Sequence, residues 1–83
     1  MSVHANLETL EGTVTTETTL NLVRRSRKIM ITNDHASNDL SFKFNASETF
    51  ATLQGTESLS LEFWTRTIII NGTNVPYRIW IFG

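Results

Sequence analysis

The sequence predicts a small all-β protein: an antiparallel β-sandwich or barrel of six to seven short strands, preceded by a short N-terminal arm or helix. Three observations predict this class. Short segments rich in β-branched and aromatic residues recur along the chain. Several of these segments alternate between apolar and polar side chains. Runs of Gly, Asn, Asp and Ser separate them every eight to twelve residues or so, roughly the spacing of strands in sandwiches and barrels.

The chain has 83 residues, which is enough for one domain and too few for two. We expect residues 1–12 to form an N-terminal arm and residues 13–83 to form a single β domain, with Gly12 at the boundary. Val3, Leu7 and Leu10 recur at roughly helical spacing. A short helix and an extended arm therefore both fit this segment, which is marginal in length for an isolated helix.

The first part of the β domain contains two predicted strands and a turn. Thr13–Val23 is rich in threonine and valine, which suit a pleated surface. Lys28–Thr32 places two isoleucines on one face. Asn33–Asp39 is a run of turn-forming residues, because Asn, Asp and Ser side chains bond nearby backbone groups.

The strongest strand signal comes next. Leu40–Asn45 alternates apolar with polar residues, so that its three apolar side chains share one face. Phe50–Leu53 predicts a short strand, and Ser58–Phe63 alternates again. Thr67–Ile70 and Tyr77–Phe82 are expected to form a final pair joined by Asn71–Pro76, in which Asn-Gly favours a hairpin connection.

The final pair carries apolar side chains on both faces. Ile68–Ile70 is apolar throughout, and Trp80 and Phe82 point away from Tyr77, Ile79 and Ile81. A second apolar face must be covered by the N-terminal segment, by a curled sheet or by another chain. Since a domain of this size without disulfides commonly gains stability by oligomerisation, we expect a homo-oligomer. The candidate interface residues are Val3, Leu7, Leu10, Ile69, Arg78, Trp80 and Phe82.

The sequence offers no basis for catalysis. It has no cysteine, its two histidines lie far apart, and its four glycines are isolated, which excludes disulfides, thiolate metal sites and glycine-rich phosphate loops. No nucleophile is paired with a base in a known spacing. We therefore predict a protein that is not an enzyme, with no catalytic residue, no cofactor and no metal.

Two features suggest binding. Arg24, Arg25, Arg27 and Lys28 concentrate positive charge in five residues. Because the chain as a whole has a net charge of −1, a solvated loop or docking to an acidic patch of a protein is favoured over nucleic acid. Four aromatic residues could form a platform for sugars or bases, although core or subunit-interface packing is favoured, because a small domain needs most of its aromatics for burial: Trp64, Tyr77, Trp80 and Phe82.

Targeting signals are not visible. The first residues lack a basic segment followed by an apolar run, and apolar runs such as Ile68–Ile70 are far too short to span a membrane. We expect synthesis in a cytoplasm and no membrane partner.

Four strings across residues 29–83 carry a resemblance: I-T-N-D at 31–34, N-D-L-S-F at 38–42, L-Q-G-T-E-S-L at 53–59 and Y-R-I-W-I-F-G at 77–83. The pattern resembles that of small β-sandwich virion proteins of tailed bacteriophages. It departs from that pattern at Thr56, which is inserted between Gly55 and Glu57, and the first 28 residues lie outside the resemblance.

The resemblance implies a virion structural protein at the head surface, neck or tail, made in the host cytoplasm and acting through contacts with copies of itself or with other virion proteins. A carbohydrate-binding, lectin-like module that uses Trp64, Trp80 or Tyr77 is the first alternative. A small barrel that binds nucleic acid through the basic run is the second alternative.

Overall fold

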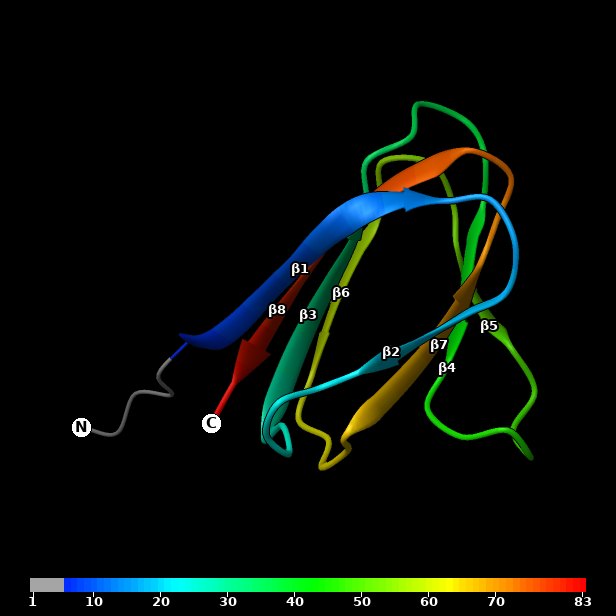
Figure 1. Ribbon diagram of the computed structural model, residues 1–83. Helices are drawn as coiled ribbons and strands as arrows, with labels where there is room; N and C mark the ends of the chain where they lie inside the picture. The colour runs from blue at the N-terminus through cyan, green and yellow to red at the C-terminus, as the bar shows by residue number, and fades with distance from the viewer. Residues whose placement is uncertain (1–5) are drawn as a thin grey trace.

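The computed structural model describes residues 6–83, with side chains from residue 8 onward. Over this range the chain forms eight strands and no helix. The strands make two four-stranded antiparallel sheets that face each other (Figure 1). The predicted all-β class is confirmed, in its sandwich form and with more strands than expected.

The two sheets are named by their order along the chain. In spatial order, the first sheet contains β1 (Asn6–Val14), β8 (Val75–Phe82), β3 (Lys28–Asn33) and β6 (Ser58–Leu61). The second sheet contains β2 (Thr18–Asn21), β7 (Thr67–Asn71), β4 (Leu40–Lys43) and β5 (Ala51–Leu53).

The strand pairing is nested. β4 pairs with β5, β3 with β6, β2 with β7 and β1 with β8, as if one long hairpin had been rolled up around the core. Within residues 6–83, only the β4–β5 connection stays in one sheet, and every other connection crosses to the opposite sheet. This is the double Greek-key arrangement of a jelly roll.

The N-terminal segment belongs to the sandwich from Asn6 onward. β1 pairs with β8 along its length and runs through Gly12 without a break. The helical alternative is therefore wrong for residues 6–12, and Gly12 is not a boundary between an arm and the domain. A lone helix of this length is barely stable, whereas pairing with β8 satisfies the backbone and places Leu10 opposite Ile79. Val3 lies outside the described residues.

The expected hairpin between Thr67–Ile70 and Tyr77–Phe82 is also wrong. β7 lies between β2 and β4 in the second sheet, while β8 lies between β1 and β3 in the first. These two strands are the most apolar, and a central position with a neighbour on each side buries them better than a hairpin at an edge. Gly72 is needed for close packing, because a Cβ at this position would lie 2.9 Å from Val75 Cγ2. The residue of this loop with a positive φ is Asn74, at 52°.

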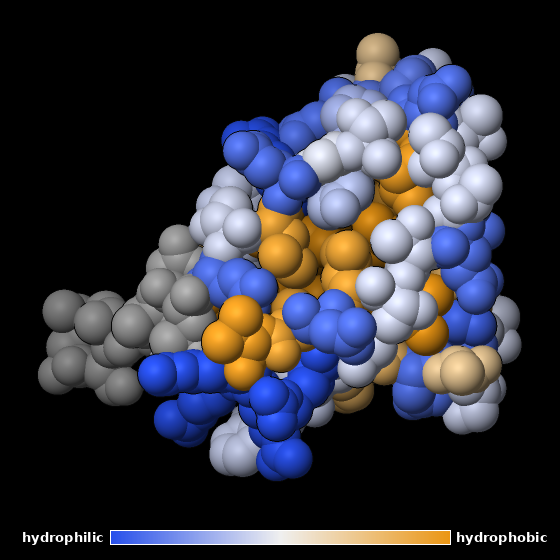
Figure 2. Space-filling model, in the orientation of Figure 1, coloured by the Kyte–Doolittle hydropathy of each residue, from blue (hydrophilic) through white to orange (hydrophobic). Residues whose placement is uncertain are grey.

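The core fills the space between the sheets. Eight apolar residues of the core have no exposed surface: Leu40, Val75 and the six isoleucines Ile29, Ile31, Ile68, Ile70, Ile79 and Ile81. The two-residue alternation of β3 and β8 directs four of these side chains inward, as predicted, and β7 supplies Ile68 and Ile70. Figure 2 shows apolar side chains along the seam between β1 and β2, where the partly buried Leu10 and Leu20 pack against the core.

One end of the sandwich is held by a buried amide. Asn33 has no exposed surface, and its Nδ2 donates to the carbonyls of Asn38 (2.8 Å) and Leu53 (3.0 Å). Its Oδ1 accepts the N–H of His35 at 2.9 Å. His35 Nδ1 in turn accepts the N–H of Asn38 at 2.8 Å, so this histidine acts as a turn residue. The 34–39 loop is therefore tied to β5 through Asn33.

Candidate functional site

At the other end of the sandwich, two loops far apart in the sequence are joined by a buried hydroxyl. Ser26 lies in the β2–β3 loop and has no exposed surface. Its Oγ donates to the carbonyl of Phe63 at 2.6 Å and accepts the N–H of Thr65 at 3.1 Å. Its own N–H donates to the carbonyl of Thr65 at 2.8 Å. The β2–β3 loop is thereby fixed to the β6–β7 loop on both sides of Trp64.

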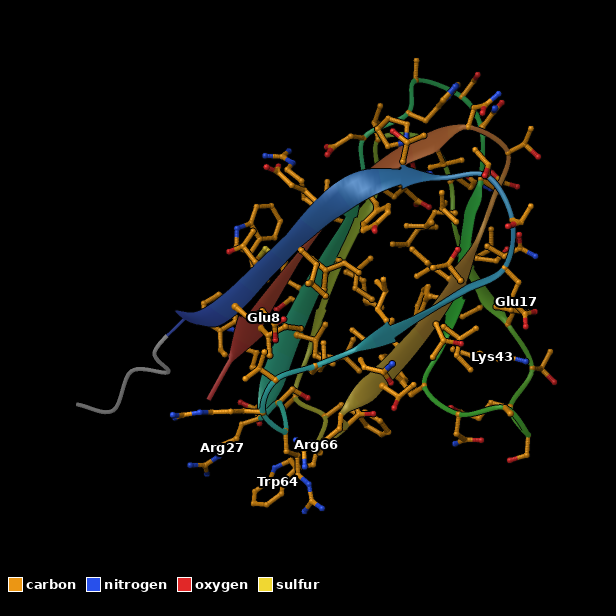
Figure 3. The ribbon with its side chains drawn as sticks, viewed as in Figure 1. Glu8, Glu17, Arg27, Lys43, Trp64 and Arg66 are labelled. Carbon is orange, nitrogen blue, oxygen red and sulfur yellow. The ribbon has the colours of Figure 1, made fainter. Side chains whose placement is uncertain are left out.

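The hydrogen bonds of Ser26 to Phe63 and Thr65 determine which side chains surround Trp64. Arg25 and Arg27 flank Ser26 in the sequence, just as Phe63 and Thr65 flank Trp64. The guanidinium carbons of Arg25 and Arg27 consequently lie 6.0 and 5.5 Å from the centre of the Trp64 ring. Trp64 remains 62% exposed, and Figure 3 shows it pointing away from the sheets at this end of the molecule. Contacts of this kind between a cation and an aromatic face are attractive.

A further arginine joins the group. Arg66 Nη2 donates to the carbonyl of Val23 at 3.1 Å. Val23, which is 73% exposed, also donates its N–H to Glu8 Oε1 at 3.1 Å. We define the basic end by six residues: Arg24, Arg25, Arg27, Lys28, Trp64 and Arg66.

The basic end concentrates the positive charge of the chain. Of its seven Lys and Arg residues, all but Lys43 and Arg78 belong to it. The carboxylates near these loops are Glu62, which precedes Phe63, and Glu8, which bonds the Val23 backbone. The predicted basic run is thus part of a larger charged surface that includes an exposed indole.

A second candidate surface is the outer face of the first sheet. Trp80 and Phe82 are partly exposed there, whereas Ile79 and Ile81 on the same strand have no exposed surface. This confirms the predicted division of β8 into two faces. Met30 lies opposite Trp80 in the neighbouring strand. Lys28 Nζ lies 6.0 Å from the centre of the Phe82 ring, beside the basic end.

Arg78 is fixed on this outer face. Its Nε donates to Asp34 Oδ2 at 2.7 Å and its Nη2 donates to Asp34 Oδ1 at 2.9 Å. The hydrogen bond to Asp34, together with the attraction of its charge, raises the pKa of Arg78. The same guanidinium lies 5.1 Å from the centre of the Trp80 ring. Asp34 therefore holds a cation beside Trp80.

Three candidate residues are placed differently from the prediction. Leu10 packs against the core, so it does not contribute to an outer interface. Ile69 does point outward, from β7, but it is only 6% exposed because it lies between Thr19 and Lys43 on the neighbouring strands. Tyr77 lies partly buried against the core, where burial raises the pKa of its phenol, so it cannot belong to an aromatic platform. The side chain of Leu7 lies outside the described residues.

Sequence reasoning missed one member of the basic end, Arg66, and the residue that joins its loops, Ser26. Ser26 looks like a solvated serine in a charged loop, and no local signal reveals its partners, which lie 37 and 39 residues away. Arg66 carries a usable signal, because it follows Trp64 by two residues in the same loop. The structure brings the basic run and Trp64 together, and it leaves Trp80 on a separate surface.

The rest of the described surface has few features of note. A shallow hollow lies at the end opposite the basic end, lined by Asn38, Asp39, Gly72 and Thr73. In residues 6–83, no three metal-binding side chains gather at one point. The described part of the chain also contains no helix of the length and apolarity needed to cross a membrane.

Comparison with known proteins identifies no relative, since no family model and no curated protein matches the sequence. The fold and the two surfaces therefore define the chain as a small jelly-roll domain that carries an aromatic sheet face and a basic, aromatic end.

Proposed function

We propose that the chain is a non-enzymatic structural protein of a bacteriophage virion, synthesised in the host cytoplasm, that works through contacts with neighbouring protein subunits. The outer face of the first sheet carries this proposal. On β8, Trp80 and Phe82 keep exposed surface on the outer face, while the isoleucines beside them are completely buried. Neither ring contributes to the core cluster of the sandwich.

The composition of this face is that of a protein interface. Aromatic residues, methionine and arginine are enriched at the centres of interfaces. The outer face combines Trp80, Phe82 and Met30 with Arg78, whose charge is already paired with Asp34. Paired in this way, Arg78 can be covered by a neighbouring subunit without leaving an uncompensated charge.

The size of the surface also suits an interface. The chain exposes 5006 Å² in total. A typical stable interface covers about 800 Å² per partner, which is about a sixth of this surface. An interface of that size on the outer face would therefore involve about a sixth of the surface of the chain.

The topology and the resemblance support the same proposal from different directions. Jelly rolls recur in viral capsid domains and in lectins. The strings that resemble phage virion proteins include Asn33, Asp34 and Arg78, which tie the 34–39 loop to the first sheet. Fold alone does not assign a function, so the exposed aromatic face remains the deciding observation.

The proposal is tested in the particles of the phage that encodes the chain. We expect mass spectrometry of purified particles to detect the chain in many copies. Deletion of its gene is expected to lower particle yield or stability in negative-stain images. Particles that lack the chain in the wild type, and that keep normal yield, shape and infectivity after deletion, would contradict the proposal.

A matched pair of variants tests the surface itself. Trp80→Thr removes the central ring and keeps a residue that suits a strand. Val23→Thr also replaces an apolar side chain with threonine, at an exposed position outside the outer face. We expect only Trp80→Thr to reduce incorporation into particles, with both variants remaining folded. Equal incorporation of both variants would exclude the Trp80 face as the contact.

A lectin-like module is the second candidate, and one observation favours it. Trp64 is a highly exposed ring, and such rings stack on the apolar faces of sugars. Titration of the chain with a panel of neutral glycans, read by tryptophan fluorescence, tests this function. A saturable change that Trp64→Ala abolishes would support it, and an unchanged signal across the panel would exclude it.

A further inference from the structure

We propose that the basic end is a binding site for single-stranded nucleic acid, in which one base stacks on Trp64 and the adjoining phosphates contact Arg25 and Arg27. This site adjoins the outer face of the first sheet at Lys28 and Phe82, but it uses Trp64, Arg25 and Arg27, which that face does not contain. It therefore goes beyond the structural role proposed above and does not depend on it.

The distribution of charge supports this site where the net charge does not. The sequence disfavoured nucleic acid because its acidic residues balance its basic ones overall. The folded chain gathers most of the basic residues at one end, where Glu8 and Glu62 are the neighbouring carboxylates. Five of the seven cationic side chains belong to the basic end, while Asp34, Asp39 and Glu57 lie in or beside the loops at the other end. A phosphate chain responds to the local charge it contacts, since binding is driven by release of its counterions.

The ring and the arginines together discriminate between three classes of ligand. An acidic peptide would use the arginines and leave the indole unused, and a neutral glycan would use the indole and leave the arginines unused. A nucleotide carries a flat base and a phosphate in one unit, and it alone of these three uses both. Single strands also expose their bases to aromatic side chains, whereas a duplex keeps its bases stacked inside.

The site is built before any ligand arrives. The hydroxyl of Ser26 bonds the residues on both sides of Trp64, and the two arginines come from the residues on both sides of Ser26. The Arg27 N–H also donates to the carbonyl of Phe82 at 2.8 Å, which fixes the loop to the end of β8. Ring and guanidinium groups are therefore held near each other by the backbone, which lowers the ordering cost of binding.

The test uses fluorescein-labelled oligothymidylate of about twelve nucleotides, with binding measured by anisotropy at low salt. We expect Trp64→Ala to weaken binding about 5- to 150-fold, as a lost base–aromatic stack does, and Trp64→Phe to weaken it less. Trp64 is exposed, so both variants should melt like the wild type. Equal affinity of Trp64→Ala and the wild type would overturn the proposal.

An abasic oligonucleotide of the same length separates stacking from charge. It keeps every phosphate and lacks every base. The wild type should therefore bind it more weakly by about the same factor as Trp64→Ala loses on oligothymidylate, and Trp64→Ala should hardly distinguish the two oligonucleotides. If the wild type binds both equally, no base stacks on Trp64 and the proposal fails.

Arg27→Ala and Lys43→Ala form a matched pair for the charges. Each removes one cation from beside an aromatic ring, Trp64 in the first case and Phe50, 4.4 Å from Lys43 Nζ, in the second. Figure 3 shows Lys43 well away from Trp64 and Arg27. We expect only Arg27→Ala to reduce the slope of log affinity against log salt, by about 0.7 for one lost contact to a single strand. Equal slopes for the two variants would contradict the phosphate contact.

Two competitors distinguish other anions. A heparin fragment that displaces oligothymidylate at equal concentration, and whose binding also depends on Trp64, would replace the proposal with a sulfated glycan. Polyglutamate that binds as tightly as the oligonucleotide would replace it with an acidic protein segment. The proposal predicts that neither the heparin fragment nor polyglutamate displaces oligothymidylate at equal concentration. It also predicts the loss of affinity in Trp64→Ala and the reduced salt slope in Arg27→Ala described above.

Discussion

Replacement of Ser26 by alanine should destabilise the protein out of proportion to the size of the change. The substitution deletes one oxygen atom in a loop, at a position with no exposed surface. That oxygen donates to the Phe63 carbonyl at 2.6 Å and accepts the Thr65 N–H at 3.1 Å. The methyl group of alanine can neither donate to the Phe63 carbonyl nor accept from the Thr65 N–H, so both groups lose their hydrogen bond to residue 26.

The magnitude follows from these two bonds. A polar group left without a partner in a buried place costs about 1–3 kcal/mol. Both groups are partly buried, so water recovers some of this loss, and we expect a decrease of about 2 kcal/mol in the free energy of unfolding. A domain of this length has roughly 4–12 kcal/mol in total. The change would therefore remove a large fraction of the stability.

Urea denaturation, monitored by tryptophan fluorescence, measures the decrease in the free energy of unfolding. With a denaturant slope of about 1–2 kcal/mol/M, the midpoint should fall by roughly 1–2 M. Ser37→Ala, which changes an exposed serine in another loop, is the control and should leave the midpoint almost unchanged. If Ser26→Ala behaves like Ser37→Ala, Ser26 does not join the two loops in solution, and the arrangement of the basic end loses its basis.

Three other changes test other parts of the structure. Asn33→Ala removes three hydrogen bonds from a fully buried amide and should cost about 3–5 kcal/mol, enough to lower the thermal midpoint sharply or prevent folding in circular dichroism. Thr56 has a φ of 68°, so Thr56→Asn, which suits that region better, should raise the free energy of unfolding by about 0.5–1 kcal/mol in urea. Burial raises the pKa of Tyr77, so the unfolded state ionises first and stability should fall above a pH of about 10. Urea titrations at pH 9 and pH 11 should show a smaller decrease in the free energy of unfolding for Tyr77→Phe than for the wild type. An equal decrease in both proteins would show that Tyr77 has the same pKa in the folded and unfolded states.

Much of the fold could be predicted from local patterns. The alternation in Leu40–Asn45 and Ser58–Phe63 marks strands, because a half-buried strand requires it. The division of β8 into an inward isoleucine face and an outward aromatic face was also visible in the sequence. These features depend only on neighbours two residues apart.

The pairing of strands could not be predicted in the same way. Thr67–Ile70 and Tyr77–Phe82 are close in the sequence and separated by Asn-Gly, which favours a hairpin, yet each pairs with strands far away in the chain. Likewise, the helical spacing of Val3, Leu7 and Leu10 rested on three residues, and pairing of β1 with β8 outweighed it. Nested pairing is a property of the whole chain and leaves little local trace.

The candidate site could likewise be predicted only in part, because its residues are visible in the sequence and their arrangement is not. The basic run and the aromatic residues were each visible, but their juxtaposition depends on Ser26, whose partners lie in another loop. The net charge was misleading because it does not show that five of the seven basic side chains gather at one end. The approach of Trp64 and Arg66 to the basic run appears only once the loops are placed in space.

The central claim, that the chain works by docking its aromatic sheet face on neighbouring subunits, is tested most directly by sedimentation equilibrium of the purified protein. We predict a mass well above that of the 9.4 kDa single chain for the wild type, and a shift toward the single-chain mass for Trp80→Thr at the same concentration. A wild type that stays at the single-chain mass up to millimolar concentration, and that binds no particle protein, would contradict the claim.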